Sequence, residues 1–307
     1  MNHSISRRTF TRLGLLPLAA FALPLSQSFG EEPAPAGPVA PAAPRFWCEL
    51  LRDDQVGVGM RLVKDGQSVW EFHLDGPEHK PFIAPLCLPD GRNIANLRPK
   101  DHVWHLGVWF SWKYLNGVNY WEPNQGGETL VKHADIQIDG ASAKAEIQMI
   151  YRDTKAPEET VLSETRNVIF GAPDESGTYE IEFRHAFTAG SKDVVLDRTP
   201  PHPKGGGYAG LGIRLTNETS QMTVRCENGE TEMLKIREKP ANWIEYRDEK
   251  TGNGLKLTVL EGPTDGCFYA QSSPTYCFIN PCPVMHHTLT IPAGEKMELV
   301  YNIRVGK

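Results

Sequence analysis

Along residues 45–307, hydrophobic and polar side chains alternate with a period of two. Residues 56–62 and 69–74 show this pattern clearly, on either side of an Asp65-Gly66 pair. A period of two predicts β-strands with one buried face, and an Asp-Gly pair is typical of the tight turn between two strands of a hairpin. We therefore expect the folded part of the chain to open with a β-hairpin.

The same pattern continues to the C-terminus. We expect further strands at residues 136–140, 143–151, 161–170, 178–189, 193–197, 210–217, 222–226, 232–236, 243–248, 255–260, 285–291 and 298–305. Turn residues such as Asn228-Gly229 separate them, and no long segment has a helical period. The sequence therefore predicts an all-β fold, a single large β-sandwich over residues 45–307. A sandwich of this length needs wide, curved sheets, and we expect a ligand on a concave face.

The N-terminal part of the chain has a different pattern. Arg7 and Arg8 precede an uncharged apolar run over residues 13–25, which is the layout of a twin-arginine signal peptide. This run is shorter than the ~20 residues that a membrane-spanning helix needs. We therefore expect a signal peptide in residues 1–30, a Pro/Ala-rich linker in residues 31–44, and a periplasmic or otherwise exported protein without a membrane span.

Composition excludes some classes of partner. The 307-residue chain has a formal net charge of -6 and no cluster of Lys and Arg, so we expect no nucleic-acid partner. The six cysteines fit no zinc-binding spacing, and both disulfides and buried free thiols are compatible with them in an exported protein.

The densest group of candidate functional residues lies in residues 81–122. Within it, His102 and His105 stand directly before an apolar run at residues 106–110 that is typical of a strand. Two histidines three residues apart in an extended chain point to opposite sides. A pocket shared by both therefore requires a turn at residues 103–104.

Three interpretations of the Asp101, His102 and His105 group remain open. The histidines can transfer protons or bind hydroxyl groups beside a ligand, with Asp101 orienting one of them. They can instead be two ligands of a divalent metal, although no cofactor is predicted. In the third interpretation Asp101 caps a turn and one histidine fills the core.

Aromatic and amide residues follow the histidines. An indole can pack in a sandwich core or stack on the C–H face of a sugar whose hydroxyl groups bond to amides and carboxylates. Both interpretations remain open for the tryptophans. The candidate ligand-binding residues here are Trp104, Trp112, Asn116, Asn119 and Trp121, with Glu122 as a candidate catalytic carboxylate.

Further candidates lie later in the chain. A Pro- and Gly-rich segment at residues 199–208 is either a plain connection or a loop over the binding face, with His202, Tyr208 and Arg214 pointing inward. His185 lies on the apolar face of a predicted strand, where it fills the core or forms a pocket floor. Glu245 is a second candidate for the catalytic carboxylate.

Several of these segments resemble the PmoA-like domain family of exported bacterial proteins. The family has a Pro-Tyr/Phe opening, an Asp-His-x-x-His-x-Gly block and an Asn-Gly-x-x-Phe-Trp block, which match residues 80–86, 101–109 and 116–121, and residues 206–214 and 293–304 are also similar. The name suggests a methane monooxygenase subunit, which is a multi-helix membrane protein, whereas this chain has no span. The family often has His-His at the second histidine, where Trp104 precedes His105 here.

The resemblance implies a galactose-mutarotase-like β-supersandwich that binds or acts on a carbohydrate. We expect a small-molecule sugar or glycoside as the partner, with His102 and His105 as acid/base or hydroxyl-binding groups and Glu122 or Glu245 as the partner carboxylate. The reaction would be that of a sugar epimerase, lyase or hydrolase. The alternatives are a non-catalytic sugar-binding module and a metal-dependent enzyme that uses residues 101–105.

Overall fold

The computed structural model describes residues 46–53, 57–74, 79–202, 206–237, 239–263 and 266–307. The expected signal peptide and the Pro/Ala-rich linker lie outside the described residues. Within the described ranges, no helix is long and apolar enough to cross a membrane.

The first of two large sheets has eight strands in the order β1-β2-β3-β4-β5-β13-β18-β17. Its strands are β1 (Phe46–Asp53), β2 (Gly57–Lys64), β3 (Gln67–His73), β4 (Phe82–Leu86), β5 (Val108–Ser111), β13 (Gly210–Leu215), β17 (Cys267–Ser273) and β18 (Tyr276–Cys282). Antiparallel pairing of β13 with both β5 and β18 brings the segment before β5 close to the C-terminal hairpin β17–β18.

The second large sheet also has eight strands, in the order β14-β15-β16-β20-β11-β10-β9-β8. Its strands are β8 (Gly127–Asp139), β9 (Ser142–Asp153), β10 (Leu162–Phe170), β11 (Tyr179–Ala189), β14 (Thr223–Cys226), β15 (Trp243–Arg247), β16 (Gly254–Glu261) and β20 (Lys296–Gly306). A small sheet and two short helices complete the described elements: β6 (Tyr114–Leu115), β7 (Val118–Asn119), β12 (Val194–Asp197), β19 (Leu289–Ile291), η1 (Asn217–Gln221) and α1 (Met233–Ile236).

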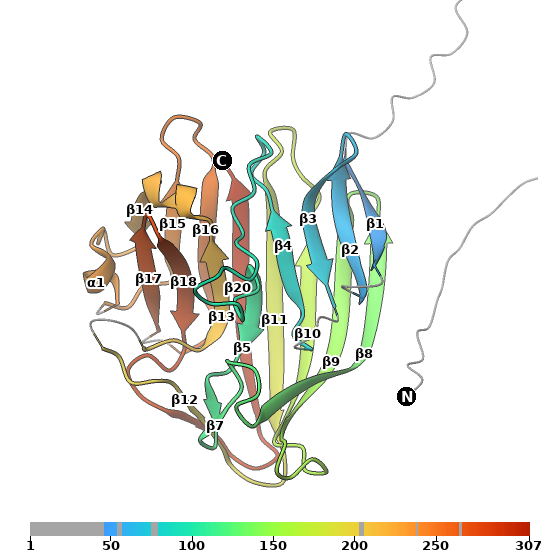
Figure 1. Ribbon diagram of the computed structural model, residues 1–307, viewed down its shortest axis with the longest axis vertical. Coiled ribbons are helices and arrows are strands. Elements are labelled where there is room, and N and C mark those ends of the chain that lie inside the picture. Colours follow the sequence, from blue (N-terminus) through green and yellow to red (C-terminus); the bar gives the residue numbers. More distant parts are fainter. Residues whose placement is uncertain (1–45, 54–56, 75–78, 203–205, 238, 264–265) are drawn as a thin grey trace, which may run out of the picture.

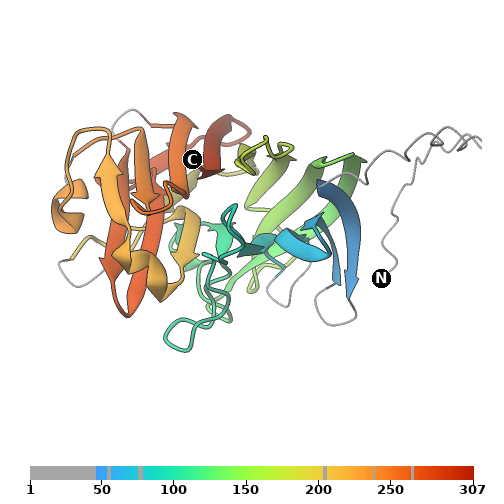
Figure 2. The ribbon, with the colours of Figure 1, turned by 90° about the horizontal axis from the view of Figure 1, so that it is seen from above.

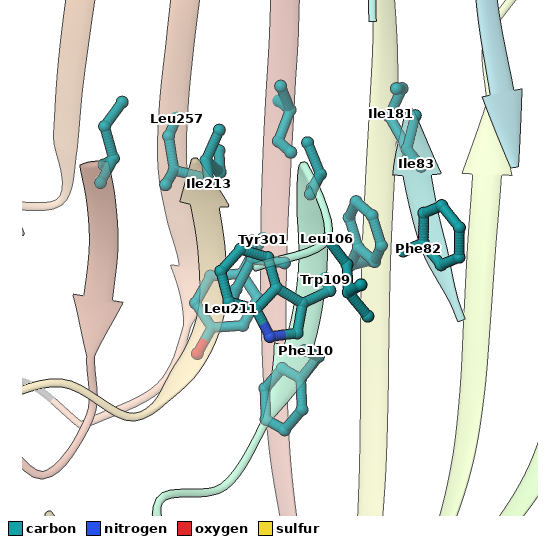
Figure 3. Close-up of a cluster of buried hydrophobic side chains, with 14 of the residues drawn as sticks. Phe82, Ile83, Leu106, Trp109, Phe110, Ile181, Leu211, Ile213, Leu257 and Tyr301 are labelled. Carbon is teal, nitrogen blue, oxygen red and sulfur yellow. The ribbon is translucent and has the colours of Figure 1, made fainter. Parts of the chain in front are cut away.

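The two large sheets pack on a common hydrophobic core, with α1 at one end of the molecule and β1 at the other (Figure 1, Figure 2). Strict alternation of buried and more exposed residues along β10 and β11 places one face of each strand in this core. Figure 3 shows part of it, with Phe110 and Ile213 from the first sheet and Ile181, Leu257 and Tyr301 from the second. Burial of these side chains is the main stabilising term of the sandwich.

The all-β sandwich predicted from the alternation is confirmed by this architecture. The predicted hairpin is present as β2 and β3, and both turn residues have positive φ, 51° at Asp65 and 79° at Gly66. The strand predicted at residues 232–236 is wrong, because this segment forms the helical turn α1. Five residues are too few for the period to distinguish a strand from one turn of helix.

All six cysteines lie in the described part of the chain as buried free thiols. Cys267 and Cys282 are opposite each other on β17 and β18.

Candidate functional site

The chain reverses direction between the two histidines. The backbone N–H of His105 donates to the carbonyl oxygen of His102 (2.9 Å), and the N–H of Arg98 donates to the carbonyl oxygen of His105 (2.8 Å). This is the turn at residues 103–104 that a shared pocket requires. The imidazole rings of His102 and His105 consequently stack, with centroids 4.6 Å apart and an interplanar angle of 25°.

Both histidines line a cavity of about 380 Å³. Its wall is mainly aromatic, and its lining consists of His102, His105, Trp121, Gly206, Tyr208, Tyr269, Gln271, Tyr276 and Phe278. The volume lies at the lower end of the ~300–1,000 Å³ that is typical of small-molecule sites.

Strand alternation explains why the cavity lies on the outer face of the first sheet. On β18, Tyr276 and Phe278 line the cavity, and Phe278 pairs with Arg214 of β13, so the intervening Cys277 and the following Ile279 point to the opposite face. The same alternation on β17 directs Tyr269 to this outer face, together with Gln271. Two paired strands thus supply four of the lining side chains.

Trp109 forms a layer beneath His105. The Trp109 and His105 rings have centroids 4.9 Å apart, and the Phe278 ring stacks on His105 at 5.3 Å. Trp109 lies over Gly212 of β13, where an added Cβ would stand 3.1 Å from the indole. The glycine therefore leaves the room that this indole occupies under the site.

His102 is held by a carboxylate. Its Nδ1 lies 2.9 Å from Oδ2 of Asp101, and the same oxygen accepts a 2.8 Å hydrogen bond from Nη2 of Arg214. Burial raises the pKa of Asp101, but the hydrogen bonds from His102 and Arg214 outweigh this, so its pKa is below the ordinary value. Asp101 is therefore ionised at neutral pH and fixes the orientation of the His102 ring.

His105 is in a different environment from His102. It is only 3% exposed, and burial, assisted by the electrostatic effect of the neighbouring His102 and Arg214, lowers its pKa to about 2. Its Nδ1 has no hydrogen-bond partner among the described residues. His105 is therefore a neutral imidazole at physiological pH.

Two arginines cover faces of the tyrosine rings in the wall. The Arg214 guanidinium lies 3.9 Å from the centroid of the Tyr276 ring, and the Arg237 guanidinium lies 3.9 Å from that of Tyr269. Neither arginine lines the cavity. The expected role of Arg214 as a direct ligand contact is thus not what the structure shows, because its guanidinium lies behind Tyr276 and Asp101 holds it there.

Glu122 and Asn119 support the wall from outside. Lys113 Nζ donates to both carboxylate oxygens of Glu122, at 2.7 and 2.6 Å, and Asn119 Nδ2 donates to Glu122 Oε2 at 2.7 Å. The side-chain oxygen of Asn119 accepts a 2.8 Å hydrogen bond from the backbone N–H of Trp121. These contacts position the Trp121 indole, and neither Glu122 nor Asn119 lines the cavity.

Four other sequence candidates lie elsewhere. Trp112 is fully buried against Phe110 and Phe187 in the core, since it directly follows β5 and lies on the same side of the chain as Phe110. Asn116 has a φ of 48° and accepts a hydrogen bond from the N–H of Val195, which closes the small sheet. His202 is exposed and Trp104 packs edge-on against His102, and neither lines the cavity.

Glu245 is not brought to the histidines. It lies on β15 of the second sheet, between the core residues Ile244 and Tyr246, and therefore points away from the core. Its carboxylate is 3.3 Å from Nη1 of Arg247 on the same strand.

His185 belongs to a buried polar cluster in the core. Its Nδ1 lies 2.7 Å from Oε1 of Glu164, which also accepts a 2.6 Å hydrogen bond from Nε of Arg166, and the hydroxyl of Tyr151 donates to Oε2 at 2.5 Å. The Phe110 ring packs 4.2 Å from the imidazole. Burial lowers the pKa of His185 to about 4 even though Glu164 opposes this, so His185 is also neutral at pH 7.

Sequence reasoning missed Tyr269, Gln271, Tyr276 and Phe278. The strand predictions skip residues 267–282, although Ser and Pro at residues 272–274 separate two runs rich in aromatic and apolar residues. This is the signal of a hairpin, and it was available in the sequence.

A metal-binding group was the second interpretation of residues 101–105. Among the residues that the structure describes, no group of three or more His, Cys, Asp or Glu side chains is arranged to hold a metal ion.

Comparison with known proteins places the chain in a family. A family model described as a family of unknown function (DUF6807) matches residues 59–307. The chain belongs to this family. No curated protein matches this sequence.

Solved structures with similar chain traces include two complete domains and part of a larger enzyme. The Slr1438 protein from Synechocystis has a TM-score of 0.39 at 11% identity, covering 86% of this chain and 96% of that one. A galactose mutarotase related enzyme from Lactobacillus acidophilus has 0.40 at 6%, covering 85% and 97%. The alpha-galactosidase from Lactobacillus brevis has 0.41 at 8%, covering 84% of this chain and 39% of its own.

Proposed function

We propose that the protein binds a sugar or glycoside in the cavity of the first sheet and that His102 is its acid/base group. The observation that carries this is the stacked His102–His105 pair on a concave, mainly aromatic cavity of about 380 Å³. Flat aromatic faces suit the C–H face of a pyranose, and Gln271 and the two histidines are available for its hydroxyl groups. Membership of the PmoA-like domain family, which the sequence resembles, is a prediction on which this proposal does not depend.

The two histidines have separate roles in this proposal. Asp101 occupies Nδ1 of His102, which leaves Nε2 to exchange a proton with a bound ligand. His105 is neutral, so it is a hydrogen-bonding group rather than an acid. A histidine that is oriented by a carboxylate, as His102 is by Asp101, is a common form of general base in enzymes.

The lining favours some sugar reactions over others. Glycoside hydrolysis ordinarily uses two carboxylic groups that flank the scissile bond. No Asp or Glu is among the described lining residues, and Lys113 and Asn119 already bind Glu122. Epimerase-like or lyase-like proton transfer by His102 therefore fits the cavity better than hydrolysis.

A non-catalytic sugar-binding module is the second candidate. The same absence of a carboxylate from the described lining favours it, because proton transfer on both sides of a sugar ring needs a second group opposite His102. The two candidates agree on the ligand and differ only in turnover.

Calorimetric titration with a panel of monosaccharides tests the proposal. We expect at least one sugar to bind the wild type and to bind His102→Ala more weakly. Proton NMR of the same sugars distinguishes the two candidates, since an enzyme accelerates anomer or epimer exchange or elimination and a binding module does not. If no sugar of the panel binds, the proposal is wrong.

A further inference from the structure

The side-chain amide of Gln271 supplies hydrogen-bond donors to the cavity. Gln271 lines the cavity, and the hydroxyl of Tyr269 donates to its Oε1 at 3.2 Å. The oxygen of this amide is therefore engaged by the protein, and its NH₂ group remains to donate. The NH₂ group of Gln271 is consequently free of this contact and available to an acceptor on the ligand.

The charged side chains around the cavity also favour a ligand with hydrogen-bond acceptors. Asp101 is paired with Arg214, and Glu122 is paired with Lys113. Arg237 donates to the carbonyl oxygen of Ala270 and forms no ion pair with a carboxylate among the described residues.

These pairings leave Arg237 as a positive charge beside the cavity, on a chain whose net charge is -6. Arg237 adds a positive charge that no described carboxylate balances, and it lies against Tyr269 in the wall. The described lining contains no Asp or Glu that would repel an anion. An excess of negative charge over the whole chain disfavours anions in general, so a preference for an anion would have to come from the site itself.

We propose that the ligand is a saccharide bearing a carboxylate, such as a uronic acid, with its carboxylate at Gln271. This rests on the proposed sugar-binding function and adds the substrate class to it. A carboxylate is planar and accepts several hydrogen bonds, which matches the amide donors of Gln271. The sugar ring then lies along the aromatic wall toward His102.

Matched sugar pairs test the charge requirement directly. Calorimetry at low ionic strength compares galactose with galacturonate, glucose with glucuronate, and mannose with mannuronate. In at least one pair the uronate is expected to bind at least tenfold more tightly than the neutral sugar, and its methyl ester, which lacks the charge, is expected to lose this advantage.

Charge variants assign the effect to the cavity. Gln271→Glu keeps the acceptor for the Tyr269 hydroxyl but adds a negative charge, and it should reduce the ratio of uronate to neutral-sugar affinity at least tenfold. Arg237→Gln should reduce this ratio severalfold and weaken its dependence on salt. Gln148→Glu is the matched control, because Gln148 is exposed on β9 of the second sheet and the same charge there should leave the ratio unchanged.

The outcomes separate this inference from the proposed function. Binding of neutral sugars as tight as that of their uronates would overturn the carboxylate while leaving a sugar site in place. Absence of binding by all six sugars would overturn both. An equal effect of Gln271→Glu and Gln148→Glu would show that the preference comes from net charge and would overturn the assignment to Gln271.

Discussion

The imidazole rings of His102 and His105 stack 4.6 Å apart, yet the two residues are chemically different groups. The side chain of His102 is 35% exposed and bonded to Asp101, whereas His105 is 3% exposed and held neutral by burial. A single turn of the backbone produces both environments. Substitution of either histidine should therefore affect ligand binding through a different interaction.

Replacing His102 by alanine should weaken sugar binding by about 5- to 150-fold, since it removes one hydrogen bond to the ligand worth about 1–3 kcal/mol. The melting temperature should stay nearly unchanged because the side chain is partly exposed. Calorimetry and thermal unfolding measure the two effects. His133→Ala, at an exposed position on β8, is the matched control and should change neither. A large fall in melting temperature with unchanged affinity would show that His102 is structural.

His105→Phe should separate packing from chemistry. The phenyl ring fills nearly the same space between Trp109 and Phe278, and Nδ1 of His105 has no described partner to lose. We expect the free energy of unfolding at pH 7 to stay within about 1.5 kcal/mol of the wild type, as for volume-conserving core substitutions. Sugar affinity should fall at least tenfold. Wild-type affinity in this variant would show that His105 only packs the wall.

Local pattern was sufficient to find one half of the site. The spacing of His102 and His105 before an apolar run indicated a loop-to-strand junction, and the required turn at residues 103–104 is present. The other half, including Gln271 and Phe278, comes from strands that reach the histidines only because β13 pairs with both β5 and β18. Pairing between distant strands leaves no trace in local periodicity.

Alternation also predicts faces without saying which face holds the ligand. Trp112 and His185 lie on strands or strand ends whose apolar faces pack between the sheets, so both fill the core. Glu245 does lie on the outward, polar face of its strand, but that strand, β15, belongs to the second sheet and not to the sheet that carries the cavity. Assigning a face to a pocket requires the order of strands in both sheets.

Removing the charge of Glu164 from its buried cluster should be strongly destabilising. Glu164→Gln removes the charge that pairs with Arg166, whose side chain is 1% exposed, and an unpaired buried charge costs about 3–5 kcal/mol. Urea unfolding should show this loss. Glu182→Gln is the control, since its partner Arg184 is largely exposed and such a pair contributes less than about 1 kcal/mol. Similar losses in the two variants would contradict the role of the buried cluster.

Export remains a proposal based on Arg7, Arg8 and the apolar run at residues 13–25. Replacing both arginines by lysine should leave the precursor in the cytoplasm, because the twin-arginine pathway requires the arginine pair. Cell fractionation with immunodetection measures the distribution. The wild-type precursor is the reference for this measurement. Unchanged export of the double variant would contradict the proposal.

The last prediction concerns acid pH, where two buried histidines should destabilise the fold. The folded-state pKa is lowered from 6.5 to about 2 at His105 and to about 4 at His185, in both cases mainly by burial. Below pH 6.5 the unfolded chain therefore binds protons that the folded protein does not, and stability falls as the pH falls. At 1.36 kcal/mol per pKa unit, each histidine should remove roughly 2 kcal/mol between pH 7 and pH 5.

Urea unfolding at pH 7, 6 and 5 measures this loss, and the variant His105→Phe should show only about half of it because one of the two groups is gone. The range from pH 7 to pH 5 separates the histidines from the carboxylates. The lowered pKa values of Asp101 and Glu164 mean that these two groups reduce folding stability mainly below about pH 5. His133→Ala should follow the wild type, because His133 is exposed on β8. A wild-type protein equally stable at pH 7 and pH 5 would mean that neither histidine is held neutral in the folded state.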